Sequence, residues 1–216
     1  MHIGDYQAFY IGVKVIDDSH ENAAGSGWNG DSVQIAFTNS NRDTITHLYN
    51  YAWASSGETI THHEQGHPTT APDTEASIIR EGTTTTYEIK IPATAMTAAT
   101  GGMPWGANAR FGVGVAVNDG DSGVDGEDIG EGGQKGWSGW GPYTVVYGKT
   151  ASQAGLVTLG QTPPPACPVS ERAEDSPADV VRLACLLVRL SADRYANPQC
   201  RVTRVMLCLS ATVCVP

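Results

Sequence analysis

The amino-acid sequence predicts an all-β protein, an antiparallel β-sandwich or jelly roll, followed by a short C-terminal tail with room for one helix. Three observations predict this class. Short segments alternate apolar and polar residues, as strands with one buried face do. Turn-forming residues separate these segments, and the 216 residues include 25 Gly. Helical periodicity of apolar residues is almost absent before the tail.

Nine strands are expected, and the first and sixth are the clearest. In the sixth, Tyr87, Ile89 and Ile91 alternate with Glu88 and Lys90. The segment "FGVGVAVN" carries two Gly, which indicates that another part of the chain approaches this strand closely. In chain order, the expected strands lie at residues 8–16, 31–37, 44–53, 58–63, 76–80, 84–92, 111–118, 143–148 and 155–160.

The domain organisation follows from a change of composition at "TPPPACP". Residues 1–161 form the predicted sandwich, and residues 162–168 form a Pro-rich linker, because a triple Pro is stiff. The first strand looks central and lies close to residue 1, so we expect the first strands of the domain to be missing from this chain. Residues 169–216 form a tail rich in Cys and Arg.

The tail is open to two interpretations. Cys167, Cys185, Cys200, Cys208 and Cys214 are all the Cys of the chain, and they fit a disulfide-rich unit but no zinc-binding spacing. The absence of Gly, Trp and Phe from this tail also fits an out-of-frame reading of a GC-rich gene. Apolar residues recur at helical spacing near residues 177–194, which predicts one amphipathic helix there.

The composition excludes some partners. The formal net charge of −10 argues against nucleic acid and anionic membranes. No run of apolar residues reaches the ~20 that a membrane helix needs. Abundant Gly and Thr with few charged residues suit an extracellular or cell-surface β domain, although no signal peptide is visible at residue 1.

The segment His63-Glu64-Gln65-Gly66-His67 matches the H-E-x-x-H pattern of zinc peptidases. That chemistry requires a helix, which places both imidazoles on one face and aims the Glu at the zinc-bound water. Gly66 and Pro68 disfavour a helix, and Thr59, Ile60 and Thr61 are β-branched. We therefore expect a strand end running into a loop, with a zinc peptidase kept as an alternative.

Tryptophans in Gly-rich loops are the first candidates for a binding site. Trp28 lies in "GSGWNGD", and Trp137 and Trp140 lie in "GWSGWGP". Small neighbours cannot bury these indoles, and a flat exposed indole can stack against the C–H face of a sugar ring. The alternative is that they are packing anchors at one end of the sandwich, and this alternative is stronger for Trp53 and Trp105.

Four stretches in order resemble the carbohydrate-binding modules of family 9, within the wider group of DOMON-like sandwiches. They are "YIGVKVIDDSH", "WNGDSVQIAF", "YEIKIP" with "FGVGVAVND", and "GWSGWG" with "GLVTLG". The resemblance covers roughly residues 6–160. It implies non-catalytic binding of a polysaccharide such as β-glucan, xylan or cellulose, by an accessory module of a secreted carbohydrate-active or surface protein.

The resemblance also implies site residues. Trp28 matches the first Trp that clamps the sugar, and Gln34 stands where the family tends to have a Glu. The second clamp is Trp137 or Trp140, with spacing slightly in favour of Trp140. Arg80 is the candidate for the family's sugar-binding Arg, and Arg42 is a poorer one.

Acidic residues suggest a structural calcium ion, which the family often carries. The candidate ligands are Asp119, Asp121 and Asp125, in a Gly-rich loop where hard oxygen ligands can gather. Asp17, Asp18 and His20 form a second such cluster. A solvated acidic loop is the alternative.

Two further functions stay open from the sequence alone. A glycosidase needs two carboxyl groups about 5 to 9.5 Å apart, which a sequence cannot show. A structural sandwich without any ligand is the other alternative.

Overall fold

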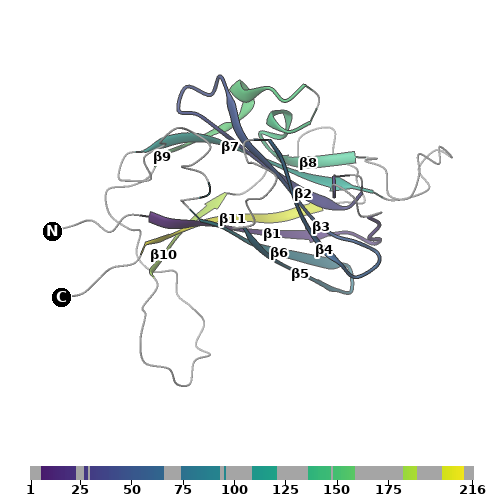
Figure 1. Cartoon of the computed structure of the whole chain (residues 1–216). Helices are drawn as coiled ribbons and strands as arrows, with labels where there is room; N and C mark the ends of the chain where they lie inside the picture. Colours follow the sequence, from purple (N-terminus) through teal and green to yellow (C-terminus); the bar gives the residue numbers. More distant parts are fainter. Residues whose placement is uncertain are drawn as a thin grey trace.

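The protein is a β-sandwich with two layers (Figure 1). The computed structural model describes residues 6–22, 27–28, 30–65, 74–92, 95, 109–120, 136–146, 148–158, 182–188 and 201–211. The strands pair antiparallel throughout these residues, and the predicted all-β sandwich is confirmed. No helix among them is long and apolar enough to cross a membrane.

The strands form a five-stranded and a six-stranded sheet. The first contains, in hydrogen-bonded order, β10 (Arg182–Val188), β11 (Arg201–Ala211), β1 (Tyr6–Ile16), β6 (Thr84–Pro92) and β5 (Glu75–Glu81). The second contains β4 (Thr59–Gln65), β3 (Ile45–Trp53), β2 (Ser32–Thr38), β7 (Arg110–Asp119) and β8 (Gly136–Trp140), and β9 (Gly155–Thr158) also pairs with β7.

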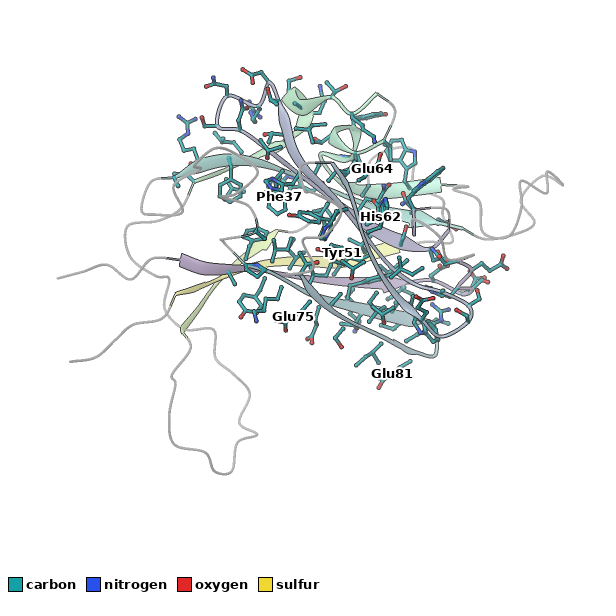
Figure 2. All side chains as sticks on the ribbon, in the orientation of Figure 1. Phe37, Tyr51, His62, Glu64, Glu75 and Glu81 are labelled. Carbon is teal, nitrogen blue, oxygen red and sulfur yellow. The ribbon has the colours of Figure 1, made fainter. Side chains whose placement is uncertain are left out.

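The core fills the space between the sheets. Alternating residues of β1, β6, β2 and β7 point inward, and Phe9, Phe37 and Phe111 meet edge to face or tilted with centroids 5.3 to 6.2 Å apart. Figure 2 shows Phe37 and Tyr51 between the layers, whereas Glu75 and Glu81 lie on the outer side of the five-stranded sheet. The alternation that predicted the strands therefore separates core from surface in this sheet.

The outer face of the six-stranded sheet is also covered. The short 3-10 helices η1 (Pro142–Thr144) and η2 (Ala151–Gln153) follow β8 and lie over this face (Figure 1). A Cβ added at Gly114 would lie 2.6 Å from the Cβ of Thr144, and one at Gly112 would lie 2.7 Å from the Cβ of Ala154. The two Gly of β7 are needed for this contact, as the sequence indicated.

Three predicted elements were wrong. The strand expected at 143–148 is η1 followed by a turn, because Pro142 starts a 3-10 turn and Thr144, Val145 and Val146 are buried by packing on the sheet face rather than by pairing. The segment expected as a loop around Trp137 and Trp140 is β8, which pairs with β7. Within the helix expected at 177–194, residues 182–188 form β10 because pairing with β11 overrides their helical spacing.

The tail contributes to the first sheet. β11 pairs with β1 from Tyr6–Ala211 to Ile16–Arg201, beside the strand that looked central in the sequence. The linker 162–168 lies outside the described residues, so the division at this point stays a prediction.

Candidate functional site

Trp28 is held in solvent at the rim of the six-stranded sheet, where its side chain is 43% exposed. Gly27 brings the chain close to the sheet with φ of 82°, a conformation that favours Gly, and its ideal Cβ position lies 3.2 Å from Ile60 Cγ2. The Trp28 carbonyl accepts a hydrogen bond of 3.4 Å from the side-chain amide of Asn118. The backbone is thus tied to β7 while the indole stays accessible.

Three amide side chains form a row on the outer face beside Trp28. Gln34 Nε2 donates to Asn50 Oδ1 at 2.7 Å, and Asn118 Nδ2 donates to Gln34 Oε1 at 3.0 Å and to the Ser32 hydroxyl at 2.9 Å. All three amides are buried, and Gln34 is 5% exposed. Gln34 therefore lies in the predicted region, but as part of a protein network rather than as an open hydrogen-bonding group.

The two late tryptophans point to opposite faces of β8. Trp137 pairs with Asn118 and packs with Ala36, Leu48 and Ala116 on the outer face, where it is 9% exposed. Trp140 packs on the inner core and fills the space over Gly155. Which of the two forms the second clamp stays a prediction, and only Trp137 shares the face of Gln34 and Asn118.

Arg80 belongs to different surroundings from the amide row. It lies on β5, where its guanidinium donates to the carbonyl of Asp17 at 3.0 Å and to the Thr85 hydroxyl at 2.9 Å. Arg42, the poorer candidate, donates to the Ala154 carbonyl at 2.8 Å and anchors η2. The structure brings Trp28, Gln34 and Trp137 to one face, and it does not bring either Arg into that group.

The H-E-x-x-H segment is on a strand, not a helix. On β4, His63 packs edge to face on Tyr49 inside the sandwich, whereas Glu64 pairs with Lys149 on the other side of the sheet. Figure 2 shows His62 and Glu64 at the six-stranded sheet. His67 lies outside the described residues. Since consecutive strand residues alternate faces, His63 and Glu64 cannot serve one metal as in a zinc peptidase.

A buried carboxylate cluster lies at one end of the sandwich. Asp17 follows β1, Asp31 precedes β2 and Asp119 ends β7, and one potential ligand atom from each lies within 4.8 Å of the others. The three side chains are 1 to 4% exposed. The cluster therefore joins the ends of strands from both sheets.

The electrostatics of the cluster are unfavourable without a counter-charge. Burial raises the pKa of Asp31 to about 8, and the negative charges of Asp17 and Asp119 contribute to the shift. Burial also raises the pKa of Asp17 and the charge of Asp119 adds to it, whereas a hydrogen bond with Asp31 and the charge of Arg80 partly offset the rise. The nearby His20, 4.0 Å from Asp31 Oδ2, does not compensate, since burial lowers its pKa and keeps the ring neutral near pH 7.

The cluster fits a hard divalent cation. Asp17 Oδ1 is fully buried and has no hydrogen-bond partner among the described residues. Oxygen ligands lie 2.3–2.6 Å from Ca²⁺, so ligands on opposite sides of one ion are about 5 Å apart, close to the spread seen here. Of the predicted ligands, Asp119 and, from the second predicted cluster, Asp17 are in the cluster, and Asp121 and Asp125 lie outside the described residues.

Sequence reasoning missed Asp31, Asn50 and Asn118. For Asp31 and Asp119 a signal existed, because each carboxylate stands at a strand end, in "GDSV" and "VND". Strand ends that share one edge of a sandwich bring such residues together. The pairing of β2 with both β3 and β7, which aligns the three amides, was not visible in the sequence.

Comparisons with known proteins identify the family. The model of the family described as "Carbohydrate family 9 binding domain-like" matches residues 3–159. A solved carbohydrate binding module family 9 from Caldicellulosiruptor kristjanssonii in complex with glucose is 14% identical, with 75% of each chain covered and a TM-score of 0.47. The same module in complex with cellotriose is 14% identical, with 76% of each chain covered and a TM-score of 0.46.

A search among curated proteins found no match. The family model nevertheless spans nearly all of the sandwich from β1 to β9. The chain therefore belongs to the carbohydrate family 9 binding domain-like family.

Proposed function

We propose that the protein is a non-catalytic module that binds a neutral polysaccharide by stacking a sugar ring on Trp28. The observation that carries the proposal is the 43% exposure of this indole, which is the one aromatic ring among the exposed large hydrophobic residues that the structure describes. An aromatic ring held in water costs hydrophobic free energy unless a partner covers it, and the apolar face of a pyranose suits a flat ring. The family supports the same function.

The charge of the chain favours a neutral ligand. The formal net charge of −10 disfavours acidic polysaccharides. β-Glucan, xylan and cellulose are the ligands we propose. Trp137 flanks the same region through its pairing with Asn118, but at 9% exposure it is packed on the sheet face and supports the region from below.

The context we propose is extracellular. A non-catalytic module acts by holding an attached catalytic or surface domain near its insoluble substrate, which raises the effective concentration of the two partners.

The test is affinity electrophoresis of the full chain through gels that contain xylan, β-glucan or a soluble cellulose derivative. The wild type should be retarded in at least one gel, and Trp28→Ala should migrate as in a gel without polysaccharide. Leu156→Ala is the matched control, since Leu156 is a large apolar residue with 40% exposure on β9. Equal retardation of wild type and Trp28→Ala would exclude stacking at Trp28, and no retardation in any gel would reject the proposed function.

We also propose that Asp17, Asp31 and Asp119 hold a structural Ca²⁺. The ion would add positive charge among three buried carboxyl groups, and would join the ends of β1, β2 and β7. Calorimetric titration should give one high-affinity Ca²⁺ per chain for the wild type and none for Asp31→Asn. Asp43→Asn, in the exposed β2–β3 turn, should bind Ca²⁺ as the wild type does.

A further inference from the structure

The segment that presents Trp28 and the carboxylate cluster share one residue, Asp31. Asp31 Oδ2 accepts the backbone N–H of Glu21 at 2.6 Å, and Oδ1 accepts the N–H of Gly120 at 3.3 Å. Its own N–H donates to the Glu21 carbonyl at 2.8 Å. The side chain therefore closes the base of the Trp28 segment, which we define by its described residues Gly27, Trp28 and Gly30.

Asn22 also holds the Trp28 segment, through hydrogen bonds to backbone carbonyl groups. Its side-chain amide donates to the carbonyl of Gly27 at 2.8 Å and to the carbonyl of Asp31 at 3.2 Å. Asn22 also forms a bridge with Gly30, and its carbonyl accepts the N–H of Ser55. Because Asn22 is 2% exposed, these bonds are made in the interior, where each counts for more than in water.

A third connection runs through β7. Asp119 belongs to the carboxylate cluster, and the adjacent residue Asn118 donates to the Trp28 carbonyl. The cluster thus contacts the Trp28 segment at its base through Asp31 and at its tip through the neighbour of Asp119. Trp28 is the one aromatic residue among the exposed large hydrophobic residues that the structure describes.

From this geometry we infer that a divalent cation at Asp17, Asp31 and Asp119 fixes the Trp28 segment, with Asn22 as the positioning residue, so that saccharide affinity depends on the cation. The inference rests on the proposed function for its saccharide half. Without the cation, Asp31 has no ligand bond that joins it to Asp17 and Asp119, so conformations in which Asp31 moves away and releases the N–H groups of Glu21 and Gly120 are more populated. With the cation, Asp31 is held and the segment is already ordered when the sugar arrives.

Thermodynamic linkage between Ca²⁺ binding and saccharide binding sets the size of the expected effect. If Ca²⁺ raises the affinity for a saccharide by some factor, the saccharide must raise the affinity for Ca²⁺ by the same factor. Couplings of this kind are typically about 5- to 150-fold. We expect at least about a fivefold tightening of cellotriose binding when Ca²⁺ replaces EGTA.

The first experiment reads the segment without any sugar. Hydrogen exchange of the full chain is followed by mass spectrometry with Ca²⁺ and with EGTA. Peptides that contain Trp28 should exchange more slowly with Ca²⁺, whereas the β5–β6 turn at Gly82 should exchange equally in both. Equal exchange of the Trp28 peptides in both conditions, in protein shown by calorimetry to bind Ca²⁺, would overturn the inference.

The second experiment tests Asn22 with cellotriose as the probe. In Asn22→Ala, Ca²⁺ should still bind within about twofold of wild type, whereas its effect on cellotriose affinity should fall to less than about half of the wild-type ratio. Asn39→Ala is the matched control, because Asn39 makes similar local bonds in the β2–β3 turn and should keep the full ratio. A residue with only a structural role would lower the melting temperature and leave the ratio unchanged.

The outcomes separate this inference from the proposed function. Cellotriose binding of equal strength with Ca²⁺ and EGTA would refute the coupling and leave saccharide binding intact. Slower exchange at Trp28 with Ca²⁺ but no retardation by any polysaccharide would refute the proposed function and with it the saccharide half of the inference, while supporting cation control of the segment.

Discussion

The outer face of the five-stranded sheet is exposed to solvent, whereas the outer face of the six-stranded sheet is covered by other parts of the chain. The strands β5 and β2 show this contrast. Along β5, exposed and half-buried residues alternate, and its outward side chains include Glu75, Ile79 and Glu81. Along β2, all seven residues are buried, although the sequence SVQIAFT includes the polar residues Ser32, Gln34 and Thr38. The outer residues of β2 are instead covered by η1, η2 and the chain near Trp28.

This difference supports the proposed site on the six-stranded sheet. The outer face of the five-stranded sheet is open to water, and a shallow groove along β5 and β6 is lined by Ser77, Ile79, Glu81, Thr84, Thr86 and Glu88. None of these is aromatic. The covered face holds polar groups in fixed hydrogen bonds beside one exposed indole, which is the preorganisation that binding a sugar requires.

The largest expected effect comes from disrupting the packing of η1 on the outer face of the six-stranded sheet, here called the covered face. Gly114→Val should lower the free energy of unfolding by about 3 kcal/mol, because its side chain would collide with Thr144 and the Gly141 carbonyl. Thr86→Val, on the uncovered face of β6, should change it by less than about 0.5 kcal/mol. Urea denaturation measures both, and equal values for the two variants would contradict the contrast between the sheets.

The next effect tests the cluster that joins the sheets. Ca²⁺ at a hundredfold excess over its Kd should raise the free energy of unfolding by about 2.7 kcal/mol, since the ion binds only the folded chain. Thermal unfolding with Ca²⁺ and with EGTA measures the change. The same stabilisation in Asp31→Asn would show that the ion binds elsewhere.

A smaller effect tests the amide row. Asn118→Ala should destabilise the protein by about 2 kcal/mol, because Gln34 loses a donor in a buried network. Ser77→Ala, on the exposed side of β5, should cost less than about 0.5 kcal/mol. If urea denaturation gives the same loss in free energy of unfolding for both substitutions, the row of amide side chains does not stabilise the covered face.

The smallest effect is expected on the uncovered face. Lys90 and Glu75 form an ion pair of 2.8 Å across β6 and β5. Both side chains are well exposed, so a double-mutant cycle with Lys90→Gln and Glu75→Gln should give a coupling of about 0.5 kcal/mol or less, falling with added salt. A coupling above about 1.5 kcal/mol would mean that this face is ordered as tightly as the other.

The sequence predicted most of the sandwich because alternation is local. Residues 84–92 were predicted and found as β6 with the same bounds. The segment "YTVVYG" misled, since its β-branched residues are buried by lying flat on Gly114 and not by pairing. Once β8 is known, the opposite faces of Trp137 and Trp140 follow from their separation of three residues, but the strand itself was hidden by its Gly content.

The candidate site was harder to predict because its parts are distant in sequence. Trp28 was found because an indole among Gly residues cannot be buried by them. Asp17, Asp31 and Asp119 come from three strand ends, and only the packing of both sheets brings their carboxylates within 4.8 Å.

The pairing of β11 with β1 has a practical consequence for anyone who shortens the chain to its family-matching part. β1 lies inside its sheet, with β6 on one side and β11 on the other. A protein that ends near residue 159 would leave the N–H and C=O groups of β1 open along one side, and such an edge is a template on which separate molecules associate. The shortened form should therefore be less soluble than the full chain, because it lacks β11, which lies outside the family match.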